Sequence, residues 1–210
     1  GFIPVRAGFD GRVSVSWARS GVGWRGYIPP EQLPRLINPP TGLLATANNQ
    51  TVGKNYPYII SHAFSHSYRA HRIYSVLNQQ KQWSERDLLA LQLDTVSEFY
   101  RFYQTLALDV LQRHADRNNA EQADLKTALE HWNGRMEASS LGIGVLVKWR
   151  QTLAEKLFAP LLMPGVAVEP GFSYAWREQE TPLRALLNAK MTPTGSPAGW
   201  DDFLLDTLAE

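Results

Sequence analysis

Proline is absent from Tyr58 to Ala159, although the chain of 210 residues contains 13 prolines. Proline lacks a backbone donor and clashes with the preceding helical turn, so long helices form where it is missing. Seven prolines and eight of the 15 glycines fall within residues 1–57, and the other six prolines fall within residues 160–210. The pattern predicts a helical centre between two parts that are broken up by turns.

Three segments follow from this distribution. Residues 1–57 are interpreted as short strands joined by a proline-rich connector, residues 58–160 as the helical part, and residues 161–210 as an irregular segment. The irregular segment is expected to end in a short capped helix near 199–205. The predicted fold class is therefore mainly α, a helical bundle with a small β portion at the N-terminus.

Apolar side chains recur every three or four residues from Leu89 to Val110, after a start at Ser84–Asp87 that resembles a capping box. This spacing is typical of one face of a helix and predicts a single long helix over 84–114. Shorter helices are expected at 61–79, 120–132 and 143–158.

Two segments of the first part predict strands. Val13–Trp17 alternates apolar and polar residues after the turn signal Asp10-Gly11. Leu43–Ala47 follows a proline- and glycine-containing turn and ends at Asn48-Asn49.

Composition excludes several classes of protein. The 21 basic and 20 acidic residues nearly cancel, and no stretch has the concentrated positive charge that nucleic acid binding requires. The longest apolar run, Leu141–Val147, is far shorter than the ~20 residues that span a bilayer. The absence of cysteine removes disulfides and thiolate catalysis. We therefore expect neither nucleic acid nor a membrane as a partner.

No single chemical motif in the sequence is strong evidence for a function. His62 and His66 have the i, i+4 spacing of a zinc pair, but the residues between them include no glutamate and no third ligand is evident nearby, so a polar helix face is the favoured interpretation. Asp94 lies in an apolar stretch, where a structural hydrogen bond or ion pair is favoured over a buried catalytic acid. No Gly-x-Ser-x-Gly elbow and no phosphate-binding glycine loop occurs.

Several short segments become informative when they are taken in order. They span almost the whole chain, at 24–29, 33–34, 38–39, 42–49, 56–57, 68–73, 91–94, 129–136 and 199–202. Together they resemble the β-chain of the penicillin acylase family, which are N-terminal-nucleophile amidohydrolases.

The resemblance implies that the N-terminal strands belong to an incomplete αββα fold of the N-terminal-nucleophile hydrolases. It also implies cleavage of the amide of a penicillin, a cephalosporin or an acyl-homoserine lactone. It implies a catalytic serine at the start of the β-chain, with its own α-amino group as base. It also implies that Asn48 donates a side-chain N–H to the oxyanion and that Arg69 holds the groups of the site in place. A fixed amide donor suits that task because it meets developing charge without reorganising.

The chain also departs from the family pattern. Residue 1 is glycine, without an initiator methionine or a signal peptide, and only 47 residues precede Asn48. We therefore expect an internal fragment of the β-chain that lacks the nucleophile and is inactive alone. Its expected partners are the upstream β-chain, the α-chain and a small acyl amide substrate.

Cofactor and compartment follow from the same resemblance. Some members bind calcium through an aspartate after a Tyr-Pro pair, but here Tyr58-Ile59-Ile60 occupies that place, so neither a metal nor another cofactor is expected. Family members suggest export of the longer protein to the periplasm. The alternative function is a helical binding or interaction module without chemistry.

Overall fold

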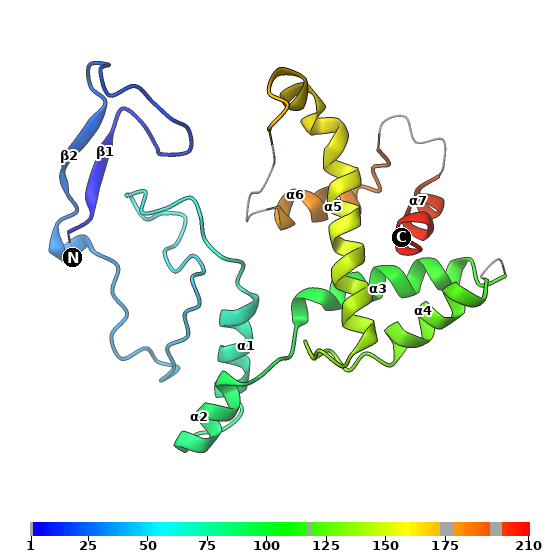
Figure 1. Ribbon diagram of the computed structural model, residues 1–210. Coiled ribbons are helices and arrows are strands. Elements are labelled where there is room, and N and C mark those ends of the chain that lie inside the picture. The colour runs from blue at the N-terminus through cyan, green and yellow to red at the C-terminus, as the bar shows by residue number, and fades with distance from the viewer. Residues whose placement is uncertain (1, 117–118, 173–178, 194–198) are drawn as a thin grey trace. The chain divides into compact units, whose positions relative to one another are not determined.

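The computed structural model describes residues 2–116, 119–172, 179–193 and 199–210 (Figure 1). The chain divides into two compact units, whose boundary lies between Leu91 and Gln92. The mainly helical class with a small two-stranded sheet is confirmed, whereas the division into three segments stays a prediction.

The sheet of the first unit consists of β1 (Pro4–Ala7) and β2 (Gly23–Tyr27), which pair antiparallel. Pro4 lies opposite Tyr27 and Ala7 opposite Gly23, with an irregularity in the register after Pro4. The connection between the two strands contains Gly8, Gly11 and Gly21, all with positive φ, a conformation that glycine adopts without strain.

The strand predicted at 13–17 is wrong, because these residues belong to the connection between β1 and β2. Trp17 packs instead against the rings of Phe9 and Trp24, with ring centroids 6.1 and 5.7 Å away. Trp17 therefore packs on aromatic rings of this connection and of β2, in place of the strand pairing that the alternation suggested.

The strand predicted at 43–47 is also absent from the described structure. Half-buried and exposed side chains do alternate from Leu43 to Gln50, as along a strand. No neighbouring strand among the described residues pairs with this stretch, so it remains an extended connection.

The helical elements of the first unit are short. They are a 3-10 turn at Pro30–Gln32, α1 (Tyr68–Leu77) and α2 (Glu85–Gln92), the last of which ends at the unit boundary. The helix predicted over 61–79 is shorter in the structure, because residues 61–66 are not helical and α1 begins only at Tyr68. Ser84 caps α2 through hydrogen bonds with Asp87, as the capping-box pattern predicted.

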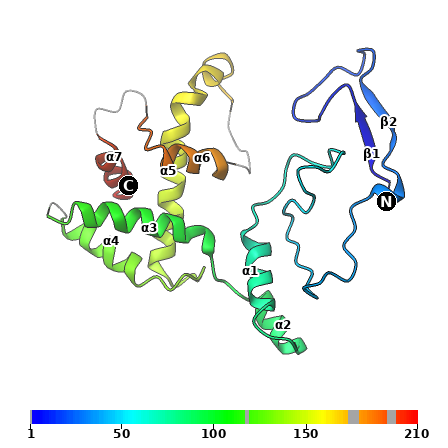
Figure 2. The ribbon, with the colours of Figure 1, turned by 180° about the vertical axis from the view of Figure 1, so that it is seen from behind.

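The second unit contains five helices in its described residues: α3 (Glu98–Arg113), α4 (Ala120–Glu130), α5 (Leu141–Val168), α6 (Glu180–Asn188) and α7 (Trp200–Leu208). The central helix is α5, which contacts the other four (Figure 2). Its buried side chains include Leu146, Trp149 and Leu153, which form the core with Tyr103, Leu129, Leu183 and Leu204. None of the described helices is both long and apolar enough to cross a membrane.

The single helix predicted over 84–114 is interrupted between α2 and α3. Asp94 accepts a hydrogen bond from the backbone of Val96, and such a side chain competes with helical hydrogen bonding. Thr95 and Val96 then form a β-bridge-like contact with Arg135 and Met136. This long-range backbone pairing interrupts the helix between α2 and α3. Apolar periodicity alone does not reveal the interruption.

Asp94 has a structural role, as expected. Its carboxylate lies 3.4 Å from the Arg135 guanidinium, in addition to its bond with Val96.

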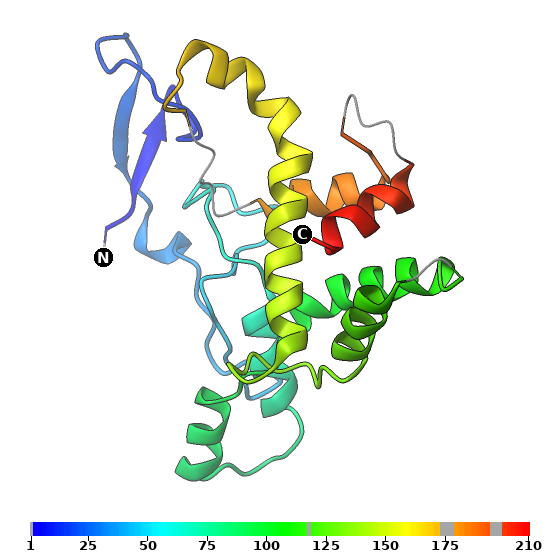
Figure 3. The same cartoon turned by 45° about the vertical axis from the view of Figure 1, so that its right-hand side comes forward.

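The helix predicted over 143–158 extends to Val168 and passes Pro160 and Pro164. Figure 3 shows its axis bending over this last stretch, as proline in a helix interior causes. Helix α6 is a further element that the proline content of 161–210 concealed. Its Pro182 lies in the first turn, where the missing N–H is tolerated.

Candidate functional site

Asn48 lies in a turn with an unusual backbone conformation. Its φ is 62°, in the left-handed region that asparagine tolerates better than most residues. Its carbonyl oxygen accepts a hydrogen bond from the Ser65 backbone at 2.8 Å. The side-chain oxygen of Asn49 accepts one from the Ala47 backbone at 3.0 Å. These two bonds hold the turn from both sides.

Arg69 lies in the first turn of α1 and contacts this turn directly. Its Nη2 donates to the carbonyl oxygen of Ala47 and to Oδ1 of Asn48, both at 2.8 Å. Side chains of a helix tilt toward its N-terminus, which directs Arg69 back toward the preceding segment. The proximity expected between Arg69 and Asn48 is therefore observed.

This contact fixes the orientation of the Asn48 carboxamide. A guanidinium has donors only, so the oxygen of the carboxamide must face Arg69. The amide nitrogen then points away from Arg69, and no described residue forms a hydrogen bond with it. Two N–H donors are thus left for another group, which is the requirement for binding an oxyanion.

The side chain of Asn48 is exposed, and the segment before it is not part of a sheet. The expectation that Asn48 ends a strand is therefore wrong for this structure, since Leu43–Ala47 lacks a strand partner among the described residues. Its access from a cleft and its catalytic role stay predictions, as does the positioning role of Arg69.

Two tyrosines tie the proline-rich connector to the segment that follows the site. The Tyr56 hydroxyl donates to the backbone oxygen of Gln32 at 2.9 Å, and the Tyr58 hydroxyl bonds to the Gln32 side chain. Their rings meet edge to face, with centroids 5.8 Å apart. Gln32 and Ser65 support this region without having been singled out from the sequence, where only the Asn48-Asn49 pair gave a signal.

The histidines have structural contacts. A ring nitrogen of His62 lies 2.8 Å from the backbone oxygen of Asp10, and the His66 ring packs near that of Tyr68. Over the parts of the chain that the structure describes, no three histidine or acidic side chains gather in a way that would hold a metal ion.

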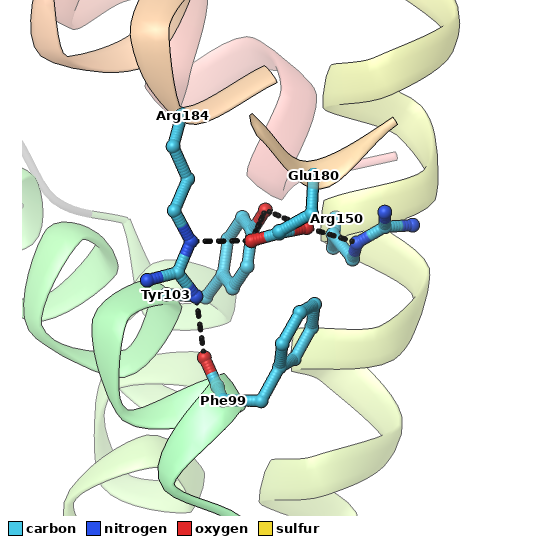
Figure 4. Close-up of polar contacts among 5 residues, drawn as sticks. All are labelled: Phe99, Tyr103, Arg150, Glu180 and Arg184. Carbon is cyan, nitrogen blue, oxygen red and sulfur yellow. Dashed lines mark hydrogen bonds and ion pairs between the residues drawn. The ribbon is translucent and has the colours of Figure 1, made fainter. Parts of the chain in front are cut away.

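The second unit contains a buried charged cluster, which the sequence did not reveal (Figure 4). Glu180 is only 2% exposed and accepts hydrogen bonds from the Tyr103 hydroxyl, from Arg150 and from Arg184. Arg184 also bonds to the Phe99 carbonyl and stacks over the Phe102 ring at 4.3 Å. Burial and the adjacent carboxylate raise the pKa of Tyr103 far above its usual range.

This cluster is suited to holding helices together rather than to chemistry. The carboxylate of Glu180, on α6, is bound by groups of α3 and α5, and each of its oxygens is occupied. Both carboxylate oxygens already accept hydrogen bonds from protein groups, and a tyrosine with a strongly raised pKa does not ionise near neutrality.

Known proteins resemble this chain over most of its length. The chain is 29% identical to the penicillin acylase 2 proenzyme of Pseudomonas sp. (strain SE83), and the match covers 99% of this chain and 27% of that protein. It is also 29% identical to the acyl-homoserine lactone acylase QuiP of Pseudomonas syringae pv. tomato, over 78% of this chain and 20% of the relative. The chain thus spans about a quarter of the length of the curated relatives it matches.

A solved structure supports the fold. The thermostable penicillin G acylase from Alcaligenes faecalis matches with a TM-score of 0.65 at 17% identity, over 99% of this chain and 42% of that chain. The family model for penicillin amidase matches residues 1–210, which is the whole sequence. The chain therefore belongs to the penicillin amidase family.

Proposed function

We propose that these 210 residues are part of a longer amidohydrolase, in which Asn48 supplies an oxyanion donor and Arg69 holds its carboxamide. The observation that carries the proposal is the hydrogen bond from Arg69 Nη2 to Asn48 Oδ1, which leaves the amide N–H groups of Asn48 available. Membership of the penicillin amidase family supports the reaction class.

The chemistry would be acyl transfer to an N-terminal serine outside this chain. The serine oxygen attacks the amide carbon and gives its proton to the α-amino group of the same residue. The amide oxygen becomes an oxyanion, which Asn48 stabilises with its N–H. The amine then leaves with the proton, and water hydrolyses the acyl-enzyme to release the acid.

The substrate class proposed is a small acylated amine. Relatives are named penicillin acylase and acyl-homoserine lactone acylase, so the acyl amides of penicillins, cephalosporins and acyl-homoserine lactones are the compounds to assay. We further propose that β1, β2 and the extended stretch at 43–47 join the sheets of an αββα fold in the longer protein, and that this protein is exported to the periplasm.

The test is substitution of Asn48 in the longer protein. In Asn48→Asp the new residue still tolerates positive φ and still offers a side-chain oxygen to Arg69. It lacks the side-chain N–H groups that would bind the oxyanion. We expect kcat to fall by about 10²–10³, the usual effect of removing one oxyanion donor. Asn48→Gly accommodates the backbone and loses the same donor, so a similar fall is expected.

Gln50→Ala is the matched control, since Gln50 is exposed two residues away, its side chain donates to the Val52 backbone, and its own backbone oxygen is kept in the variant. Its kcat should equal that of the unmodified protein. If Asn48→Asp and Asn48→Gly also keep full turnover, the donor role is refuted. A longer protein that shows no amidase activity at all would favour the non-catalytic binding module.

A further inference from the structure

The last third of α5 is apolar and poorly covered. Residues 159–168 contain no charged side chain, and this stretch leaves Leu161, Met163 and Val168 exposed by 64%, 67% and 86%. The first part of the same helix differs, because its exposed positions there include Lys148, Gln151 and Glu155. We call residues 159–168 the apolar end of α5.

This end is also a weak helix by itself. Pro160 and Pro164 each remove an intrahelical hydrogen bond, at a cost of about 3 kcal/mol relative to alanine in a helix interior. Gly165 adds a further cost of about 1 kcal/mol relative to alanine in a helix interior. A helix with such a sequence requires packing to persist, yet Leu161, Met163 and Val168 keep most of their side-chain surface exposed.

A hollow of about 490 Å³ lies beside this stretch. Its apolar walls include Phe158, Leu162 and Val166, and Arg150 also lines it. Arg150 bonds to Glu180 through Nε, so its charge is already paired. The space therefore favours an apolar side chain over an acidic one.

We propose that the apolar end of α5 is a docking surface for an apolar segment of the longer acylase that lies outside these 210 residues. This inference rests on the proposed function. The chain spans 27% of the related proenzyme and 42% of the solved acylase chain, so most of such a protein is available to cover it. Exposed apolar patches of this kind mark interaction surfaces.

Amide hydrogen exchange tests the proposal by comparing the 210-residue chain with the longer protein. Residues 146–157 of α5 are packed in the core and serve as an internal reference in both samples. In the 210-residue chain we expect the apolar end to exchange much faster than the reference. In the longer protein we expect its exchange to slow by at least about tenfold, because the covering segment suppresses local opening.

A charge placed on the surface gives a second measurement. Met163→Asp should leave the melting temperature of the 210-residue chain unchanged, since Met163 is exposed there, and should lower that of the longer protein. The control is Ala123→Asp, which adds the same charge at an exposed position of α4 and should lower neither.

If another group covers the apolar end of α5, the hydrogen-exchange results will differ from those expected here. Protection of the apolar end in the 210-residue chain at all concentrations would place its cover within the chain. Protection that grows with concentration of the 210-residue chain but is absent from the longer protein would identify a second copy. Protection that requires phosphatidylglycerol-containing vesicles would identify a lipid surface. Each of these outcomes overturns the proposal, as does fast exchange in the longer protein.

The exchange measurement does not depend on catalysis. A longer protein without amidase activity, but with a protected apolar end, would refute the proposed reaction and leave the docking surface in place.

Discussion

Arg69 binds the side chain of Asn48 and the backbone of the residue before it, although Arg69 and Asn48 are 21 positions apart. One nitrogen of its guanidinium lies 2.8 Å from the Asn48 side-chain oxygen and 2.8 Å from the backbone oxygen of Ala47. The same group therefore fixes the direction of the carboxamide and the turn that carries it. Its removal should affect orientation rather than binding of a substrate.

In the longer protein, Arg69→Met should lower kcat by about tenfold to a hundredfold and leave KM nearly unchanged. The methionine keeps much of the side-chain length but donates no hydrogen bond, so the Asn48 carboxamide can rotate away from the oxyanion. Loss of an interaction made to the transition state alone lowers kcat and kcat/KM equally.

Arg69→Lys is the matched variant for this prediction. Its ammonium can bond to one or both oxygens but lacks the planar fork of arginine, so we expect partial recovery of kcat. Steady-state kinetics with an acyl amide substrate measures both parameters. Full turnover of Arg69→Met would contradict a positioning role.

Much of the helical content was predictable because it depends on local patterns. Apolar periodicity predicted helix over the residues of α3, and the proline-free centre favoured helices at the positions of α4 and the first part of α5. The acidic start of α7 was evident near Trp200. The interruption at Asp94–Ser97 was not predictable, because it depends on backbone pairing with residues near Arg135. Likewise, the continuation of α5 beyond Pro160 was not predictable, because it contradicts the local rule that proline ends a helix.

Less of the candidate site could be derived from residues alone. Asn48-Asn49 by itself indicates a turn, and nothing in the sequence pattern places Arg69 beside it. The resemblance to a family suggested both residues, and the structure then supplied the bond between them. The Glu180 cluster was missed because its members lie on three helices and are far apart in the chain, so that no spacing connects them.

Replacing Glu180 should destabilise the second unit strongly. Glu180→Ala leaves Arg150 and Arg184 without their shared carboxylate and the Tyr103 hydroxyl without its acceptor. Breaking a buried ion pair from one side costs about 3–5 kcal/mol. Urea unfolding followed by far-UV circular dichroism measures this loss, since most helices belong to this unit.

One further variant isolates a single hydrogen bond of this cluster, and a second serves as a surface control. Tyr103→Phe removes only the hydroxyl and should cost about 1–3 kcal/mol. Glu155→Ala, at an exposed position of α5, should change stability by less than about 0.5 kcal/mol. Equal stability of Glu180→Ala and the unmodified chain would show that the cluster contributes nothing.

Asp201 should make stability depend on pH in the acid range. It lies in the first turn of α7 and binds Arg113 of α3 at 2.8 Å and a ring nitrogen of His114 at 3.0 Å. The Arg113 hydrogen bond lowers the pKa of Asp201 from 3.8 to about 2. A carboxylate with a lowered pKa stabilises the fold above its unfolded pKa, and this contribution is lost as pH falls from about 4 to about 2.

The expected contribution is on the order of 1 kcal/mol, because Arg113 is half exposed and water screens the pair. Asp201→Asn should therefore be less stable than the unmodified chain at pH 6 and equally stable at pH 2. Asp206→Asn, at an exposed position of the same helix, is the control and should show no such convergence. Urea unfolding at intervals from pH 2 to pH 6 gives the comparison, and a constant difference between the Asp201 variant and the unmodified chain would refute it.

The 210-residue chain alone should have no amidase activity. Acyl transfer of this class requires a nucleophile with an adjacent base, and residue 1 is glycine rather than serine, threonine or cysteine. Asn48 can stabilise an oxyanion only after something has attacked the carbonyl carbon. We therefore expect hydrolysis of a chromogenic acyl amide at the rate of buffer, for the unmodified chain and for Asn48→Ala alike. Turnover above buffer that persists in Asn48→Ala would place the chemistry elsewhere in the chain. Turnover that disappears in Asn48→Ala would show that this chain supplies its own nucleophile, and either result would contradict the prediction.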